Sequence, residues 1–385
     1  MKIGVPKELR DGETRVAASP DMIRKLVGNG LDVMIETGAG TKAMLPDTIY
    51  ENAGASIGRD ANETYSEADI ILKVGAPLVE GEEINELSMM KNGAVLVGLL
   101  NPLQNKAAVD AYAQAGITAF AMELLPRISR AQGMDVLSSQ SNLAGYKAVI
   151  EAAATFGKAF PMMMTAAGTI APAKVLILGA GVAGLQAIAT AKRLGAVVSA
   201  FDVRPATKEQ VESLGAKFIE VAQESGEVSE TKGGYAKEMN EEYKRKQGAL
   251  IHETLKTHDV IITTALIPGK PAPELIDKTM LKDMKPGSVI VDLAAESGGN
   301  CPETEAGKVI VKYGVTLIGY TNMPGRAPVD ASALYARNLV NFIAPMIDPE
   351  TKALAIDQND EIIAGTLITH EGKIVHPMLT NGEEV

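Results

Sequence analysis

The sequence has few of the residues that usually build metal centres or covalent cross-links. Its 385 residues contain no tryptophan, four histidines and one cysteine, Cys301. A lone cysteine cannot close a disulfide within the chain, which suits a reducing compartment. The histidines lack the close spacing of a metal site, so we interpret them as surface or packing residues: His252, His258, His370 and His376.

Aromatic residues make up 4% of the sequence, and the formal net charge is −11. So few aromatics argue against a platform for stacked bases or sugars. The negative charge repels phosphate polymers, so we expect no nucleic-acid partner. No apolar run of about 18 residues is free of charges and helix breakers, which argues against a spanning helix, and Met1–Pro6 is typical of a strand rather than a secretory leader. These features predict a soluble protein of cytoplasmic type.

Short apolar runs alternate with helix-like stretches, which is typical of parallel sheets covered by helices. We predict an α/β protein with two doubly wound, Rossmann-like domains separated by a cleft. The predicted strands are Lys2–Val5, Val33–Glu36, Ile70–Val74, Ala94–Leu99 and Thr118–Met122, followed by Val175–Leu178, Val197–Phe201, Lys217–Glu220, Val260–Thr264, Ser288–Leu293 and Val315–Ile318.

The same pattern predicts where the domains divide. We assign residues 1–136 together with 327–385 to the first domain and residues 137–326 to the second, joined by the helix-patterned run Ser139–Phe156. The chain then crosses between the domains twice, so the crevice between them is the expected ligand site.

Two local predictions concern the end of the chain. Asp330 or Ser332 is expected to cap a helix over Ala333–Ala344. The segments Glu361–Thr369 and Lys373–His376 are expected to form a hairpin that packs back on one domain.

The interval Val221–Lys246 is rich in Glu and Lys and lacks apolar periodicity. One interpretation is a solvated excursion. The other is a mobile flap, in which Gly233 and Gly234 form the hinge and Tyr235 closes over a ligand.

The run KVLILGAGVAG contains the strongest functional motif. An apolar strand leads directly into Gly179-Ala180-Gly181-Val182-Ala183-Gly184 and an Ala-rich helix, and a second strand ends at Asp202. Such glycines allow a tight turn, close approach of a pyrophosphate and close packing of helix on strand. The helix N-terminus favours the anion, and Asp202 can accept hydrogen bonds from both adenosine ribose hydroxyls. The motif predicts a dinucleotide site.

The acid also bears on which dinucleotide binds. Asp202 would repel a 2′-phosphate, which favours NAD(H), although Arg204 could host such a phosphate. Val203 completes this region of the predicted site. Ala265 and Leu266 follow a strand on the same edge of the sheet and are expected against the adenosine side or the bridging ribose.

Polar residues gather in the Pro- and Gly-broken segment that precedes the second domain. This segment is the natural wall for the nicotinamide end, because its side chains can satisfy the donors and acceptor of a carboxamide. An equally open alternative is a linker that joins two domains by ion pairs. The cofactor-binding candidates here are Arg127, Ser129, Arg130, Gln132, Asp135 and Ser138.

Several stretches resemble the alanine dehydrogenase/nicotinamide nucleotide transhydrogenase family over essentially the whole chain: IGVPKE, ETRVAASP, LKV, GAGVAGLQA and AFDVR. The run RISRAQGMDVLSSQSNLAGYKAV resembles the transhydrogenase branch. The resemblance implies the NAD(H)-binding component, or domain I, of a proton-translocating transhydrogenase. In that branch this component docks on an NADP(H)-binding domain and a membrane-embedded proton channel, and hydride passes directly between the two nicotinamides. It also implies a homodimer, associated with the inner membrane through its partners and active only with them.

The resemblance also implies residue roles. Residues matching Arg127, Gln132 and Asp135 surround the nicotinamide in transhydrogenases and are our catalytic candidates, with Ser138 beside them. Gly234 and Tyr235 match the family's mobile loop. Arg130 and Gln132 are our candidates for the rim that contacts the partner.

The main alternative is an alanine dehydrogenase. In that branch residues matching Arg15 and Lys73 hold the substrate, and a histidine acts as acid and base. Here Asn101 stands where that histidine is expected, and an amide cannot shuttle the proton. Hydride exchange between two nicotinamides needs no such shuttle, so the departure favours a transhydrogenase. Arg15 and Lys73 would then be remnants in a buried ion-pair network. A third possibility is a non-catalytic NAD-sensing protein.

Overall fold

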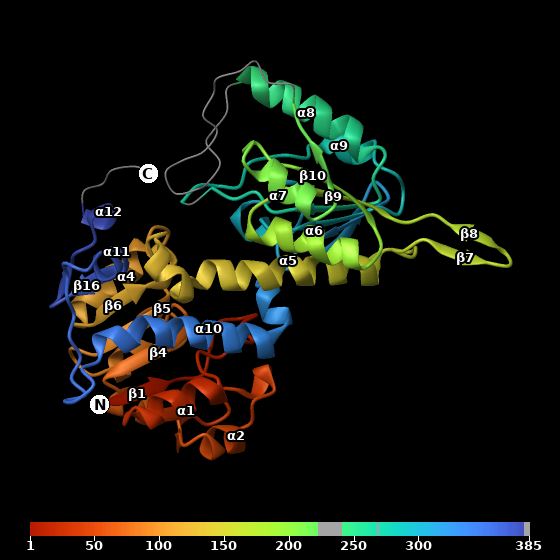
Figure 1. Cartoon of the computed structure of the whole chain (residues 1–385). Helices are drawn as coiled ribbons and strands as arrows, with labels where there is room; N and C mark the ends of the chain where they lie inside the picture. The colour runs from red at the N-terminus through yellow and green to blue at the C-terminus, as the bar shows by residue number, and fades with distance from the viewer. Residues whose placement is uncertain (222–240, 268, 381–385) are drawn as a thin grey trace. The chain divides into compact units, whose positions relative to one another are not determined.

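The computed structural model describes residues 1–221, 241–267 and 269–380. It confirms the predicted α/β class with largely parallel sheets. The chain forms two compact units (Figure 1). Unit 1 comprises Met1–Gln140 and Gly325–Val385, and unit 2 comprises Ser141–Pro324.

Unit 1 contains an eight-stranded sheet in the order β17-β16-β6-β5-β4-β1-β2-β3. Strands β1 to β6 are parallel, whereas β16 pairs antiparallel with both β6 and β17. Parallel strands need crossover connections, which the intervening helices provide. The strands are β1 (Lys2–Val5), β2 (Asp32–Glu36), β3 (Ser56–Gly58), β4 (Ile70–Gly75), β5 (Val95–Leu99), β6 (Thr118–Ala121), β16 (Leu367–His370) and β17 (Lys373–Ile374).

Polar side chains start several helices of unit 1. Ser19 accepts a hydrogen bond from the backbone N–H of Met22 at the start of α1, and Asp60 and Asn105 cap α3 and α4 in the same way. The helices are α1 (Pro20–Gly28), α2 (Asp47–Asn52), α3 (Ala61–Glu67), α4 (Lys106–Gln114), α10 (Pro328–Ile343), α11 (Glu361–Thr366) and α12 (Pro377–Thr380). Short 3₁₀ helices lie at η1 (Thr41–Ala43), η2 (Glu86–Met89), η3 (Met122–Leu124), η4 (Ser129–Met134) and η7 (Ala344–Met346).

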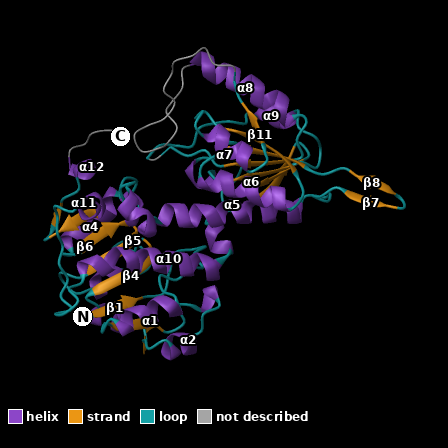
Figure 2. Cartoon of the chain, viewed as in Figure 1, coloured by secondary structure: helices purple, strands orange, loops and turns teal. Residues whose placement is uncertain are grey.

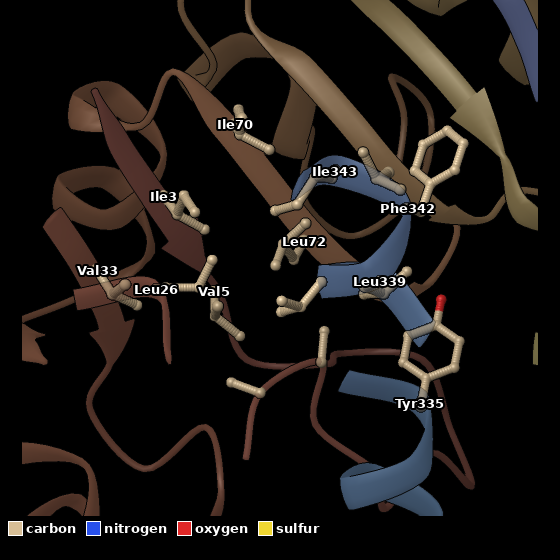
Figure 3. Packing of buried hydrophobic residues seen from close by; sticks show 14 of the residues in the cluster. Ile3, Val5, Leu26, Val33, Ile70, Leu72, Tyr335, Leu339, Phe342 and Ile343 are labelled. Atoms are coloured by element: carbon tan, nitrogen blue, oxygen red, sulfur yellow. The ribbon is translucent and has the colours of Figure 1, made fainter. Parts of the chain in front are cut away.

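Alternate residues of β4 face two different cores, as the pleat of a strand requires. Ile70 and Leu72 belong to one core, to which α10 contributes Leu339 and Phe342 (Figure 3). Ile71 packs in the core on the other side. The C-terminal segment thus supplies a helix to a sheet made mainly by the N-terminal third of the chain.

Unit 2 contains a seven-stranded sheet in the order β11-β10-β9-β12-β13-β15-β14, parallel except for β14. Its strands are drawn in orange in Figure 2. Its strands are β9 (Lys174–Leu178), β10 (Val197–Phe201), β11 (Lys217–Ile219), β12 (Val260–Thr263), β13 (Val289–Asp292), β14 (Val309–Lys312) and β15 (Val315–Ile318). Strands β7 (Met163–Thr165) and β8 (Gly168–Ile170) form a separate hairpin.

Helix α5 (Val136–Thr155) begins in unit 1 and continues into unit 2. The other helices of unit 2 are α6 (Val182–Arg193), α7 (Thr207–Ser213), α8 (Glu241–Leu255) and α9 (Lys278–Lys282). Two 3₁₀ helices are η5 (Ala295–Ser297) and η6 (Met323–Arg326), the second lying where the chain returns to unit 1. Within the described ranges, no helix is long and apolar enough to cross a membrane.

Both local predictions for the end of the chain need correction. Neither Asp330 nor Ser332 caps α10, because the helix already begins at Pro328, whose missing N–H needs no partner in a first turn. Glu361–Thr366 is a helix capped by Asp360 rather than a strand. The hairpin is therefore limited to β16 and β17.

Candidate functional site

The glycine-rich turn of unit 2 joins β9 to α6 in a conformation that depends on its glycines. Gly179 has a φ of +102°, and a Cβ there would lie 2.4 Å from Thr264 Oγ1. A Cβ on Gly184 would lie 1.9 Å from the carbonyl oxygen of Gly179, so only glycine lets the helix approach the turn this closely.

The first turn of α6 has the features of an anion site. Gly181 occupies the cap position without a side-chain hydrogen bond to the helix, so the first N–H groups are not satisfied by a cap. A Cβ on Gly181 would meet no atom closer than Arg204 Nη2 at 3.9 Å, so there is space beside the helix start. Val182, the first helical residue, is exposed. A pyrophosphate therefore fits these groups, as the motif predicts.

Asp202 follows β10, and the residue is only 8% exposed. One carboxylate oxygen accepts the backbone N–H of Ala180 and the Nη2 of Arg204, at 2.7 and 2.8 Å. The other accepts the backbone N–H and the Nε of Arg204, both at 2.9 Å. A carboxylate offers about four acceptor positions, so all four are used. A ribose diol can use this carboxylate only if Arg204 gives up some of its ion pair.

The segment after β12 is tied to the same turn. Thr264 Oγ1 donates to the carbonyl of Gly179 at 3.1 Å. Ala265 exchanges two hydrogen bonds with the side chain of buried Asn300, and Leu266 is 46% exposed. Asn300 was not among the predicted site residues, since nothing local in the sequence marks it. It fixes the backbone of Ala265, while Leu266 offers an apolar surface.

Four of the polar candidates in unit 1 lie in the 3₁₀ helix η4 or shortly before it, and all four are exposed to solvent: Arg127, Ser129, Arg130 and Gln132. Arg130 also makes a bidentate ion pair with Asp360, with N–O distances of 2.7 and 2.8 Å. The Arg130 guanidinium lowers the pKa of the Asp360 carboxyl to about 2. This pair lies within unit 1, so it does not join two domains.

Asp135 and Ser138 lie together at the start of α5. The Asp135 carboxylate accepts the backbone N–H of Ser138 at 2.9 Å and also its hydroxyl. Asp135 thus acts as the cap of α5, and both side chains are half-buried. Gly234 and Tyr235 fall outside the described residues, so their roles stay predictions.

Arg15 and Lys73 are buried and paired with carboxylates. Arg15 binds Glu13, with an N–O distance of 2.7 Å. Lys73, 1% exposed, binds Glu86 at 3.0 Å and Glu8 at 3.5 Å. Burial raises the pKa of the Glu8 carboxyl, while the nearby Lys73 ammonium partly offsets that rise. These residues form the buried network expected of a structural role.

Asn101 lies in a strained but well-bonded turn after β5. Its φ is +51°, its backbone N–H donates to Glu123, and its side-chain amide donates to Gln104 at 2.9 Å. Burial raises the pKa of the Glu123 carboxyl. No group of three or more potential metal ligands occurs among the residues that the structure describes.

Family models and known proteins are similar to this chain over most of its length. The family model described as "Alanine dehydrogenase/PNT, N-terminal domain" matches residues 4–144, and the corresponding C-terminal model matches residues 148–377. The chain is 58% identical over 381 residues to an NAD(P) transhydrogenase subunit alpha protein of Rhodospirillum rubrum, covering 99% of each chain. It is 32% identical over 384 residues to an alanine dehydrogenase of Halomonas elongata, covering 98% of this chain and 95% of the relative. A transhydrogenase structure from Sinorhizobium meliloti superposes with a TM-score of 0.85 at 48% identity, covering 98% of this chain and 99% of that one.

Proposed function

Because this chain belongs to the alanine dehydrogenase/PNT family, we propose that it is the NAD(H)-binding component of a proton-translocating transhydrogenase. Hydride passes directly between NAD(H) on this chain and NADP(H) on a partner domain. The 58% identity to a transhydrogenase alpha subunit supports this function. The observation that carries it is Asn101, which is exposed after β5 with its amide bonded to Gln104, because an amide cannot shuttle the proton that an alanine dehydrogenase needs.

The chain's own residues bind and orient the dinucleotide in this proposal. The N–H groups at the start of α6 bind the pyrophosphate, and Asp202 binds the adenosine ribose after Arg204 moves aside. Val182, Val203, Ala265 and Leu266 provide the surrounding contacts. When bound, NAD(H) supplies the hydride-carrying ring.

The nicotinamide end is assigned to the polar segment of unit 1. Arg127, Gln132 and Asp135 orient the carboxamide, assisted by Ser138, so that the reacting faces meet without solvent between them. Ser129 and Arg130 border this group. Hydride transfer between two nicotinamides needs no proton from these side chains. This is consistent with Asn101 at the position where an alanine dehydrogenase would need a proton shuttle.

Partners complete the activity in the proposal. An NADP(H)-binding domain brings its own nicotinamide to within about 3–3.5 Å of the first, with Arg130 and Gln132 on the contacting rim. A membrane-embedded partner couples the transfer to proton movement and places the complex at the inner membrane. The component functions as a homodimer.

Reconstitution tests this function. The chain mixed with the NADP(H)-binding component of a transhydrogenase should reduce an NADP analogue in the presence of NADH, whereas the chain alone should not. NADH oxidation by the chain alone with pyruvate and ammonia would identify an alanine dehydrogenase instead. No transfer with any partner preparation would point to an NAD-sensing protein.

A second arm tests the residues. Asp135→Ala and Arg127→Ala should slow hydride transfer by about tenfold or more, while ADP-ribose binding changes little. An unchanged rate of hydride transfer in both variants would show that this segment is a linker and does not orient the nicotinamide.

A further inference from the structure

Helix α10 is bonded to the polar segment of unit 1, which comprises η4 and the first turn of α5. Asn338 of α10 is 7% exposed, and its side chain bonds to two points of that segment. Its amide nitrogen donates to the carbonyl of Gly133 at 3.0 Å, and its amide oxygen accepts the Ser139 hydroxyl at 2.7 Å. One side chain therefore connects the end of η4 to the first turn of α5.

The carbonyl of Gly133 is fixed more firmly than a single bond would allow. Asn341, one turn along α10, also donates its amide to this oxygen at 3.0 Å. A carbonyl oxygen has two lone pairs, and both are used here. The orientation of this peptide plane, which lies between Gln132 and Asp135, is consequently set by α10.

The far end of the segment is anchored as well. Gln140 accepts a hydrogen bond from Arg15 Nη1 at 2.8 Å and donates to the carbonyl of Ala331 in α10 at 3.1 Å. The Nε and Nη2 of the same Arg15 guanidinium donate hydrogen bonds to the carboxylate of Glu13. Both groups of the Gln140 amide are thus bound, and the first turn of α5 cannot rotate without breaking buried hydrogen bonds.

We propose that Asn338 is a positioning residue for hydride transfer. It holds the backbone on both sides of Asp135, so that Gln132, Asp135 and Ser138 meet the nicotinamide in one arrangement. This inference rests on the proposed function. Displacement of a reacting group by about 1 Å can cost about a hundredfold in rate, and a site is held best when its supporting groups are themselves locked.

Asn338→Asp provides the sharpest test. The new carboxylate can still accept the Ser139 hydroxyl, but it places an oxygen where the donor to Gly133 stood. In the complex with the NADP(H)-binding component, kcat should fall about tenfold or more while the KM for NADH and the Kd of ADP-ribose stay within about twofold. Hydrogen exchange at the amides of Asp135 and Ser138 should accelerate in the same variant.

A second variant removes one bond to Asn338, and a third is the control on the same helix. Ser139→Ala removes one of the two bonds and should lower kcat by about threefold. Arg337→Gln, which changes an exposed side chain on the same helix, should leave kcat and exchange unchanged.

Several outcomes would overturn the positioning role. These are an unchanged kcat in both Asn338→Asp and Ser139→Ala, or a loss of ADP-ribose binding as large as the loss of kcat. If Asn338→Asp does not fold, an unchanged kcat in Ser139→Ala overturns it alone. Failure of the unaltered chain to transfer hydride would contradict the proposed function itself. An active chain whose variants are equally active would contradict only the positioning role of Asn338.

Discussion

The carboxylate of Asp202 accepts the backbone N–H of Ala180 at 2.7 Å. This bond joins the end of β10 to the glycine-rich turn after β9. The acid therefore has two tasks, since it holds the turn in place and is our candidate for the ribose. Its ion pair with Arg204 also changes the interpretation of that arginine, which lies on the carboxylate rather than standing free for a 2′-phosphate.

Replacing Asp202 should change coenzyme preference. Asp202→Asn removes the charge that repels a 2′-phosphate and frees Arg204, so NADH affinity should fall by about tenfold, on the order of 1.4 kcal/mol, while NADPH affinity rises. Fluorescence titration with both coenzymes measures the ratio. Glu220→Gln is the matched control, because it removes an exposed acid of the same unit, which pairs with Lys208. A ratio that is the same in both variants would refute the role of Asp202.

Lys73 should matter for stability far more than for activity. Lys73→Met leaves the carboxylates of Glu8 and Glu86 buried without their cation, which should lower the free energy of unfolding by about 3–5 kcal/mol. Lys91→Met, in the exposed pair with Asp69, should cost less than about 1 kcal/mol. Urea unfolding followed by circular dichroism suits a chain without tryptophan. Similar losses in the two variants would contradict a buried network.

The pair of Arg130 and Asp360 predicts a specific acid response. Because the pKa of Asp360 is lowered from 3.8 to about 2, the stability that the pair contributes is complete above about pH 4 and is lost as the pH falls through about 2. The carboxyl carbon of Asp360, followed by NMR, should titrate with a midpoint near 2. In Arg130→Gln the titration midpoint of Asp360 should rise toward 3.8. The same midpoint in the variant and in the unaltered chain would show that the ion pair is absent in solution.

Much of the fold was predictable because buried parallel strands are continuous apolar runs. Three strands have the predicted bounds: β1, β10 and β15. Strand β3 was not predicted, since it has only three residues and a single buried one, Gly58. The run Glu361–Thr366 is predicted as a strand, although a short apolar run does not distinguish a strand from a helix. In the structure it is a helix, and Asp360 caps its N-terminus.

The candidate site divides along similar lines. The turn from Gly179 to Gly184 is a local pattern, and its spacing to Asp202 is visible in the sequence. By contrast, Arg130 meets Asp360 across 230 positions, and Asn338 meets Ser139 across 199. Pairs that far apart leave no periodic signal, so a single sequence cannot reveal which residues elsewhere in the chain hold the polar segment.

Gly184 allows the close packing of α6 on the turn to be tested directly. A Cβ added there would lie 1.9 Å from the carbonyl oxygen and 2.9 Å from the carbonyl carbon of Gly179, and backbone atoms cannot move aside as a side chain can. Gly184→Ala should therefore push the first turn of α6 away from β9. We expect a loss of about 1–3 kcal/mol in the free energy of unfolding and at least tenfold weaker NADH binding, because the N–H groups that face the pyrophosphate move with the helix.

Gly248→Ala is the matched control for this substitution. Gly248 lies inside α8 of the same unit, and a Cβ there would make an ordinary contact with Met280 Cε at 3.7 Å. This change should leave NADH binding unaltered and stabilise the chain by about 0.5–1 kcal/mol, since alanine suits a helix interior better than glycine. Calorimetric titration with NADH compares the two variants. If Gly184→Ala bound NADH as tightly as Gly248→Ala, the start of α6 could not be where the pyrophosphate binds, because displacing that turn would have displaced its ligand.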